Sequence, residues 1–192
     1  MAAAMILLRH GQSEFNVVFG ATRRDPGIRD PKLTEEGRRQ AHAAAEALHG
    51  LGIDALIASP YTRALETAEI VAATLEVPIA VEPLVGERVA FVCDLGSSPD
   101  ELRSRWPHLS LDHLPECWWP TPEESEERLL QRCARFRAEI AARENWRRIG
   151  VVTHWGFIRG LTGLTVTNGT IVRCNPHRPE LEAEVITPNK DQ

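Results

Sequence analysis

Lysine is almost missing from this sequence: 20 of its 22 basic residues are arginine, and only Lys32 and Lys190 are lysine. Positive charge is not in excess either, since 27 acidic residues give a formal net charge of −5. A mildly acidic chain is a poor candidate for binding nucleic acid or an anionic membrane surface. The arginine bias indicates either a GC-rich coding bias or guanidinium groups that bind phosphate or carboxylate through two hydrogen bonds.

Cysteines are few, and no apolar run is long enough to span a membrane. The cysteines form no C-x-x-C pair, so neither a disulfide framework nor a zinc site is expected. We predict reduced and mostly buried thiols at Cys93, Cys117, Cys133 and Cys174. The stretch before Arg9 has too few apolar residues and no charged start, unlike a signal peptide. These features predict a cytoplasmic protein.

The composition fits a single globular domain. Hydrophobic residues make up 43% of the 192 residues, which is enough to form one buried core. No repeat, linker or low-complexity segment divides the chain, so one domain over residues 1–192 is expected. Neither a glycine-rich P-loop nor a G-x-G-x-x-G motif is present, so nucleotide binding of those kinds is not supported.

Short apolar runs alternate with segments whose apolar residues have helical spacing. This alternation predicts an α/β fold, a three-layer sandwich in which a mostly parallel sheet of about six strands carries helices on both faces. The expected strands are 5–8, 54–58, 78–82, 149–153, 170–174 and 181–186, and the expected helices begin near residues 34, 59, 98, 121 and 156.

The starts of the helices are predicted from capping residues. Thr34 is expected to cap the first helix, and Ser59-Pro60 supplies an N-cap followed by a proline at the first helical position. Thr121-Pro122 is expected to begin the longest helix in the same way. The charged run 123–128 at the start of that helix predicts a solvated face.

Charged and polar residues follow four of the predicted strands. In parallel sheets, binding sites form just beyond the carboxyl ends of the strands. These ends place Arg9 and His10 after the first strand, Arg63 after the second, Glu87 after the third and His154 after the fourth. Each residue alone has an ordinary structural explanation, but their convergence at one edge predicts a functional site.

The residue types at this edge fit phosphoryl transfer. A histidine with a pKa of about 6.5 is largely uncharged near neutral pH and can act as a nucleophile. Neighbouring arginine charges lower the histidine pKa further and neutralise the charge that develops on the phosphoryl oxygens. A carboxyl group that holds its proton can protonate the leaving oxygen. No metal is required for this chemistry.

Four segments resemble the motifs of the histidine phosphatase superfamily, the phosphoglycerate-mutase-like proteins, in the same order. They are R-H-G-Q-S-E-F-N at 9–16, L-T-E-E-G-R-R-Q-A at 33–41, A-S-P-Y-T-R-A-L-E-T-A at 58–68 and V-T-H-W-G at 152–156. The resemblance covers at least residues 5–165.

The resemblance implies a role for each matching residue. His10 would be the nucleophile that becomes phosphohistidine, and Glu87 the general acid, with Asp94 as the second candidate for that role. The phosphate pocket would consist of Arg9, Arg63 and His154, and Ser13 and Asn16 would contact the phosphate or orient its ligands. The family needs no metal or other cofactor.

Three functions fit the resemblance. A phosphomonoester phosphatase is favoured, because the segment after Glu87 lacks the pattern of the mutases; the alternatives are a phosphoglycerate mutase and a non-catalytic phosphate-binding scaffold. The expected partner is a small phosphomonoester or a phosphoprotein, and the chain would be a monomer or a homodimer. Arg23 and Arg24 lie near enough in sequence to reach a substrate.

Two further patterns have competing interpretations. His108 and His113 could be metal ligands, although a loop is a poor scaffold for such a site. The segment 117–120, C-W-W-P, could be either a mobile lid over a substrate or packing beneath a long loop.

Overall fold

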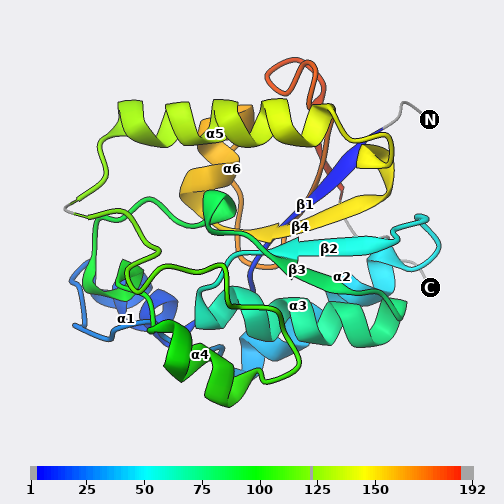
Figure 1. Cartoon of the computed structure of the whole chain (residues 1–192). Helices are drawn as coiled ribbons and strands as arrows, with labels where there is room; N and C mark the ends of the chain where they lie inside the picture. Colours follow the sequence, from blue (N-terminus) through cyan, green and yellow to red (C-terminus); the bar gives the residue numbers. More distant parts are fainter. Residues whose placement is uncertain (1–3, 122, 187–192) are drawn as a thin grey trace.

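A six-stranded sheet forms the centre of the molecule in a computed structural model that describes residues 4–121 and 123–186 (Figure 1). The strand order is β3-β2-β4-β1-β5-β6. Strands β3, β2, β4 and β1 pair in parallel, whereas β5 is antiparallel to β1 and β6 is antiparallel to β5. The strands are β1 Met5–Arg9, β2 Ala55–Ala58, β3 Ile79–Val81, β4 Ile149–Thr153, β5 Ile171–Cys174 and β6 Ala183–Ile186. The predicted strands and the mostly parallel sheet are confirmed.

Helices cover both faces of the sheet, which confirms the predicted three layers. Helices α2 and α3 lie on one face and α5 and α6 on the other (Figure 1). The helices are α1 Glu14–Thr22, α2 Glu35–Leu48, α3 Thr62–Leu75, α4 Pro99–Arg105, α5 Glu126–Ala141 and α6 Trp155–Thr162, with 3-10 turns η1 Pro83–Val85, η2 Val92–Asp94 and η3 Trp146–Arg148. In the described residues no helix is both long and apolar enough to cross a membrane.

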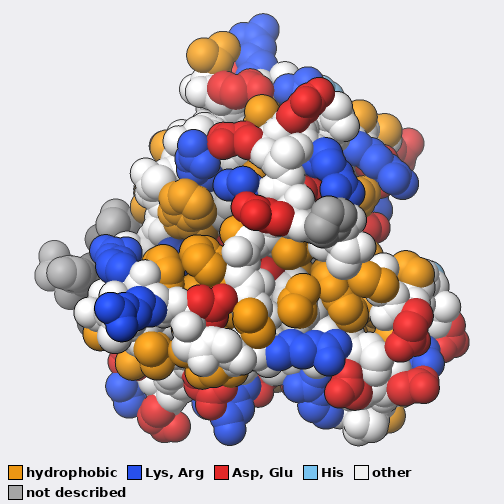
Figure 2. Space-filling view, turned by 90° about the vertical axis from the view of Figure 1, so that its left-hand side faces the viewer, with side chains coloured by type: hydrophobic (Ala, Val, Ile, Leu, Met, Phe, Trp, Pro, Cys, Tyr) orange, Lys and Arg blue, Asp and Glu red, His pale blue; other side chains and the backbone are white. Residues whose placement is uncertain are grey.

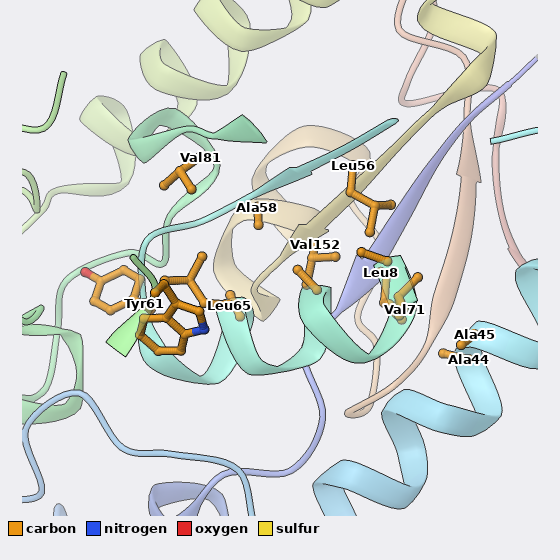
Figure 3. Packing of buried hydrophobic residues seen from close by; sticks show 14 of the residues in the cluster. Leu8, Ala44, Ala45, Leu56, Ala58, Tyr61, Leu65, Val71, Val81 and Val152 are labelled. Atoms are coloured by element: carbon orange, nitrogen blue, oxygen red, sulfur yellow. The ribbon is translucent and has the colours of Figure 1, made fainter. Parts of the chain in front are cut away.

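Alternate residues of each strand supply the two cores. Leu8, Leu56 and Val152 pack with α3 residues such as Leu65 on one face (Figure 3). Leu7, Ile57 and Val151 instead pack on the other face with residues of α5 and α6. Burial on both faces explains why these strands read as continuous apolar runs in the sequence.

The predicted cap of α3 is wrong. The helix begins at Thr62 rather than after Ser59, and the Ser59 hydroxyl lies 2.8 Å from the His154 ring. A carboxylate from a distant loop caps the helix instead: Asp30 accepts hydrogen bonds from the backbone nitrogen of Thr62 at 2.9 Å and from its hydroxyl at 2.7 Å. Nothing in the sequence around Ser59 indicates that Asp30 caps this helix.

The predicted start of α5 at Thr121 is also wrong, and Pro122 lies outside the described residues. Ser125 caps the helix by accepting a hydrogen bond from the backbone nitrogen of Arg128. The chain cannot be helical earlier, because Glu124 donates its backbone N–H to Val89 and buries its side chain. The solvated face predicted for 123–128 is therefore wrong at Glu124.

Helix α1 was not predicted. It begins with a reciprocal capping box, in which the Ser13 hydroxyl accepts from the backbone nitrogen of Asn16, and the Asn16 side chain accepts from the backbone nitrogen of Ser13. This S-x-x-N pattern was the available signal. The predicted cap Thr34 of α2 is confirmed, and α4 begins where it was expected, with Ser98 as its cap.

The cysteines and the C-W-W-P segment contribute mainly to packing. All four cysteines are free, and three of them, Cys93, Cys133 and Cys174, are buried. Trp118 of the C-W-W-P segment is buried edge-on against Tyr61 with a centroid distance of 4.7 Å, which favours packing over a lid at this position.

Candidate active site

The carboxyl ends of the parallel strands open into a cavity of about 550 Å³. Figure 2 shows the face of the molecule on this side, where hydrophobic side chains gather among arginine or lysine side chains. The predicted site residues that line the cavity are Arg9, His10, Ser13, Asn16, Arg63, Glu87 and Asp94. His154 lies just behind them, with its ring centroid 5.0 Å from that of His10.

His10 is held in a defined tautomer. Its Nδ1 lies 2.7 Å from the carbonyl oxygen of Gly11, and a carbonyl can only accept, so Nδ1 carries the proton. Burial, followed by the charges of Arg63 and Arg9, holds the pKa of His10 well below its ordinary value. The ring is therefore neutral near pH 7, and Nε2 keeps a lone pair for nucleophilic attack.

Two buried nitrogen atoms at the site have no partner of their own. Among the residues that the structure describes, the buried side-chain nitrogen and oxygen atoms without a hydrogen bond are Arg9 Nε and His154 Nδ1. The Ser59 hydroxyl accepts from the backbone of Tyr61; if it donates to His154 Nε2, the ring proton of His154 lies on Nδ1. An unpaired buried donor costs about 1–3 kcal/mol. An oxyanion placed beside His10 would satisfy such donors.

Arg63 is buried and locked in place, whereas an arginine in a first helical turn is ordinarily solvated. Its guanidinium donates to the Cys93 carbonyl at 2.9 Å and to Asp94 Oδ1 at 3.1 Å. It also lies over the Tyr61 ring, 4.6 Å from the centroid. Burial is the largest single influence and opposes the charge, but Asp94 together with Cys93, Tyr61 and Glu87 outweighs it, so the pKa of Arg63 is raised.

The carboxylate of Asp94 is fully used as an acceptor. Oδ1 accepts from Arg63, and Oδ2 accepts from the backbone nitrogens of Ala90 and Phe91, each at 3.1 Å. Both oxygens are thus occupied in holding Arg63 and the backbone of residues 90 and 91. This arrangement favours an orienting role for Asp94 over the role of second-choice general acid.

Glu87 has the environment that a proton donor needs. Its Oε1 accepts from the backbone nitrogens of Arg88 and Gly156, both at 2.8 Å, so a proton is expected on Oε2. Burial and then the charge of Asp94 raise the pKa of Glu87. A buried carboxyl of raised pKa at the edge of a cavity is a common feature of general acids.

An alanine at position 156 tests this placement of Glu87. A Cβ there would lie 2.3 Å from Glu87 Oε1, so the carboxyl must move. Because a misplacement of 1 Å can cost about 10²-fold in rate, we expect Gly156→Ala to lower kcat by about that factor, with little change in KM. Gly160→Ala in the same helix is the control, since its Cβ would meet Cys133 instead. An unchanged kcat in Gly156→Ala would contradict the role of Glu87.

A buried ion pair that the sequence analysis missed supports the Glu87 loop. Arg132 of α5 donates to both carboxylate oxygens of Glu124 and to the carbonyls of Leu84, Gly86 and Glu87. A signal existed, because Arg132 follows Leu129 by three residues and so falls on the apolar stripe of its helix. An arginine on a buried stripe needs partners, and here they are the loop that carries Glu87.

The other predicted residues have mixed outcomes. The Ser13 hydroxyl and the Asn16 side-chain oxygen are used in the capping box, so both lie at the site but serve the start of α1. Asn168, which was not predicted, donates to the His10 carbonyl at 3.2 Å and to Asn16 at 3.1 Å. Arg23 lines the cavity, as expected, and Arg24 does not.

The proposed histidine ligands do not come together. His113 Nε2 lies 2.9 Å from the Val81 carbonyl, and His108 pairs with Glu69 at 3.2 Å. Within residues 4–121 and 123–186, no group of three or more His, Cys, Asp or Glu side chains is placed to hold a metal ion.

Known proteins are similar to this chain in sequence and fold. The family model of the histidine phosphatase superfamily (branch 1) matches residues 5–174. A 2,3-bisphosphoglycerate-dependent phosphoglycerate mutase of Methylobacterium radiotolerans is 39% identical over 55% of this chain and 50% of its own. The chain thus spans about half the length of the curated relatives that it first matches.

Two longer matches extend the comparison. A protein of Photorhabdus laumondii named "Probable phosphoglycerate mutase GpmB" is 33% identical over 88% of this chain and 70% of its own. The solved structure of a mycobacterial glucosyl-3-phosphoglycerate phosphatase has a TM-score of 0.65 at 25% identity and covers 91% of both chains.

Proposed function

Since this chain belongs to the histidine phosphatase superfamily, we propose that it is a phosphomonoester phosphatase that acts through a phosphohistidine at His10. The observation that carries the proposal is the pairing of a neutral, buried His10 with the unpaired buried nitrogens Arg9 Nε and His154 Nδ1. That combination fits a tetrahedral oxyanion seated against a nucleophile.

The first half of the reaction forms the covalent intermediate. His10 Nε2 attacks phosphorus, the bond between phosphorus and the ester oxygen breaks, and Glu87 gives its proton to the departing oxygen. Arg9 and Arg63 supply two positive charges to the phosphoryl oxygens, and His154 supplies a neutral N–H donor. The products are the free alcohol, phosphohistidine and an ionised Glu87.

The second half restores the enzyme. Ionised Glu87 takes a proton from a water molecule, whose oxygen attacks phosphorus as the bond to Nε2 breaks. Inorganic phosphate leaves, His10 is again neutral and Glu87 is again protonated. The donors serve both halves without moving, because the phosphoryl oxygens stay in the same pocket.

A second candidate is a phosphoglycerate mutase, as the names of the curated relatives indicate. In that reaction the phosphoryl group returns to another oxygen of the same substrate, so water must be excluded and a carboxylate must be bound. Arg23, Arg88 and Arg159 line the cavity and could bind one. The two candidates differ in their product: phosphate from a phosphatase and an isomeric phosphoglycerate from a mutase.

Phosphate release from a panel of phosphomonoesters, with and without EDTA, tests the proposal. We expect release from several esters and unchanged rates in EDTA, because two guanidinium groups neutralise the phosphoryl charge. The panel includes 3-phosphoglycerate, and its products are followed by phosphorus NMR. Isomerisation without phosphate release would favour the mutase, and loss of activity in EDTA would contradict metal independence.

A further inference from the structure

One side of the cavity takes no part in the proposed chemistry. Beyond the phosphate pocket, the lining combines the arginines Arg23, Arg88 and Arg159 with the apolar residues Phe15, Phe19, Ala90, Phe91, Leu129 and Trp155. The whole cavity, at about 550 Å³, has the size of a small-molecule site rather than that of a phosphate group alone. The alcohol part of the substrate must occupy this apolar side.

Three phenylalanines form a continuous aromatic wall. Phe15 and Phe19 lie one turn apart on α1 and stack at 5.1 Å, and Phe91 contacts them at 5.5 Å and 5.1 Å between centroids. Phe91 is 39% exposed, and Trp155 on the same cavity is 37% exposed. Large apolar side chains exposed in a concave site gain free energy when an apolar ligand covers them.

The aromatic wall is tied to the phosphate pocket. The backbone nitrogen of Phe91 donates to Asp94, and the same carboxylate holds Arg63. The next nitrogen, that of Val92, donates to Asp25 Oδ2 at 2.8 Å, which joins this loop to the segment after α1. A phosphate bound by Arg63 therefore sets the distance at which its alcohol part meets the wall.

The charges of the lining exclude a cationic alcohol. The acidic residues among the described lining are Glu87 and Asp94, and both serve the phosphate end. The basic residues further out include Arg23, whose guanidinium lies 5.9 Å from the Phe19 centroid, and Arg159, 5.5 Å from that of Trp155. An ammonium group here would meet like charges and no free carboxylate.

We propose that this apolar side is a leaving-group subsite for phosphomonoesters of alcohols that carry no positive charge and have an aromatic ring or an apolar group of similar size. The proposal rests on the proposed function for its chemistry. The subsite itself can be measured without turnover, using phosphonates, whose carbon–phosphorus bond this chemistry does not cleave.

Calorimetry compares three phosphonates with the intact protein. Benzylphosphonate should bind about 10- to 100-fold more tightly than methylphosphonate, because the wall covers its ring. The cationic 2-aminoethylphosphonate should bind no more tightly than methylphosphonate. Equal affinities for benzyl and methyl compounds, or tightest binding of the aminoethyl compound, would overturn the subsite.

Alanine variants test which residues cause the preference for benzylphosphonate over methylphosphonate. Phe91→Ala and Phe19→Ala should each lower the ratio of benzyl to methyl affinity by about tenfold. Val18→Ala is the matched control, because Val18 is 37% exposed on the same helix as Phe19 and does not line the cavity. An unchanged ratio in both phenylalanine variants would overturn the assignment.

The phosphate-release assay separates the two proposals. If no ester is hydrolysed but benzylphosphonate keeps its advantage, the proposed function fails and the subsite stands. If esters are hydrolysed but the phosphonates bind equally, the subsite fails and the proposed function stands.

Discussion

Replacement of His10 by alanine is expected to abolish turnover, with a fall in kcat of about 10⁴-fold or more. Loss of a nucleophile removes the covalent route entirely, and the remaining pocket can only bind phosphate. The fold should persist, because the described hydrogen bond of the His10 side chain reaches only its neighbour Gly11. Phosphate release, together with thermal unfolding of the variant, measures both effects.

A second histidine provides the control, and a trapped intermediate identifies the reacting atom. His108→Ala should keep full activity, since His108 is an exposed residue paired with Glu69. Brief mixing with labelled substrate and an alkaline quench should leave acid-labile label on wild-type His10 and none on His10→Ala. Phosphorus NMR should place the phosphoryl group on Nε2 of His10, because Nδ1 is hydrogen-bonded to the Gly11 carbonyl oxygen. Label on serine, cysteine or His154 would contradict the assignment.

The pH dependence at the acid side follows from the same histidine. Burial and two arginine charges lower the pKa of His10, so the ring stays neutral well below pH 6.5. The reaction needs the neutral ring, and the rate should therefore hold as the pH falls through 6.5 and decline only at lower pH. A decline centred at 6.5 would indicate that His10 is not shielded in this way.

The strands, and the edge of the sheet at which the site residues meet, were predictable because the sequence patterns that indicate them are local. Runs such as 149–153 are apolar because both faces of the sheet are buried, and parallel strands bring their ends together whatever the loops do. His10, Arg63, Glu87 and His154 could therefore be predicted to meet before any side-chain geometry was known.

The details that were wrong depend on distant partners. Asp30 caps α3 from a segment more than thirty residues earlier in the chain. In the sequence, Glu124 looks like part of a charged helix start, and only its ion pair with Arg132 shows why it is buried. In each pair one partner, Asp30 or Glu124, lies in an irregular segment. No periodicity links that residue to its helical partner, so the local sequence carries no record of the pair.

Replacement of Glu87 by glutamine is expected to lower kcat far more for esters with poor leaving groups than for esters with good ones. Glutamine keeps the shape but cannot give up a proton, and loss of a general acid typically costs about 10²- to 10⁴-fold. An alkyl phosphate expels a strongly basic alkoxide, whereas a nitrophenyl phosphate expels an anion that is stable at neutral pH. We expect the full loss in kcat on the alkyl ester and a much smaller loss on the nitrophenyl ester.

Asp94→Asn is the matched control, because it removes a neighbouring carboxylate that holds Arg63. Loss of that positioning acts on the phosphoryl group, which is common to both substrates. At a pH on the acid side of the decline, where Glu87 keeps its proton, the two esters should therefore lose activity equally. A selective loss on the alkyl ester in Asp94→Asn would make Asp94 the acid. Equal losses on both esters in Glu87→Gln would make Glu87 a positioning residue.

The pH profile at the alkaline side gives an independent test of the same carboxyl. Burial and the charge of Asp94 raise the pKa of Glu87, so the acid keeps its proton above the ordinary range. The rate on the alkyl ester should fall as the pH rises through this raised pKa, and the fall should disappear in Glu87→Gln. In Asp94→Asn one of the two causes is lost, so the pKa of Glu87 drops and the decline moves to lower pH. A decline that stays in place in both variants would show that another group carries the proton.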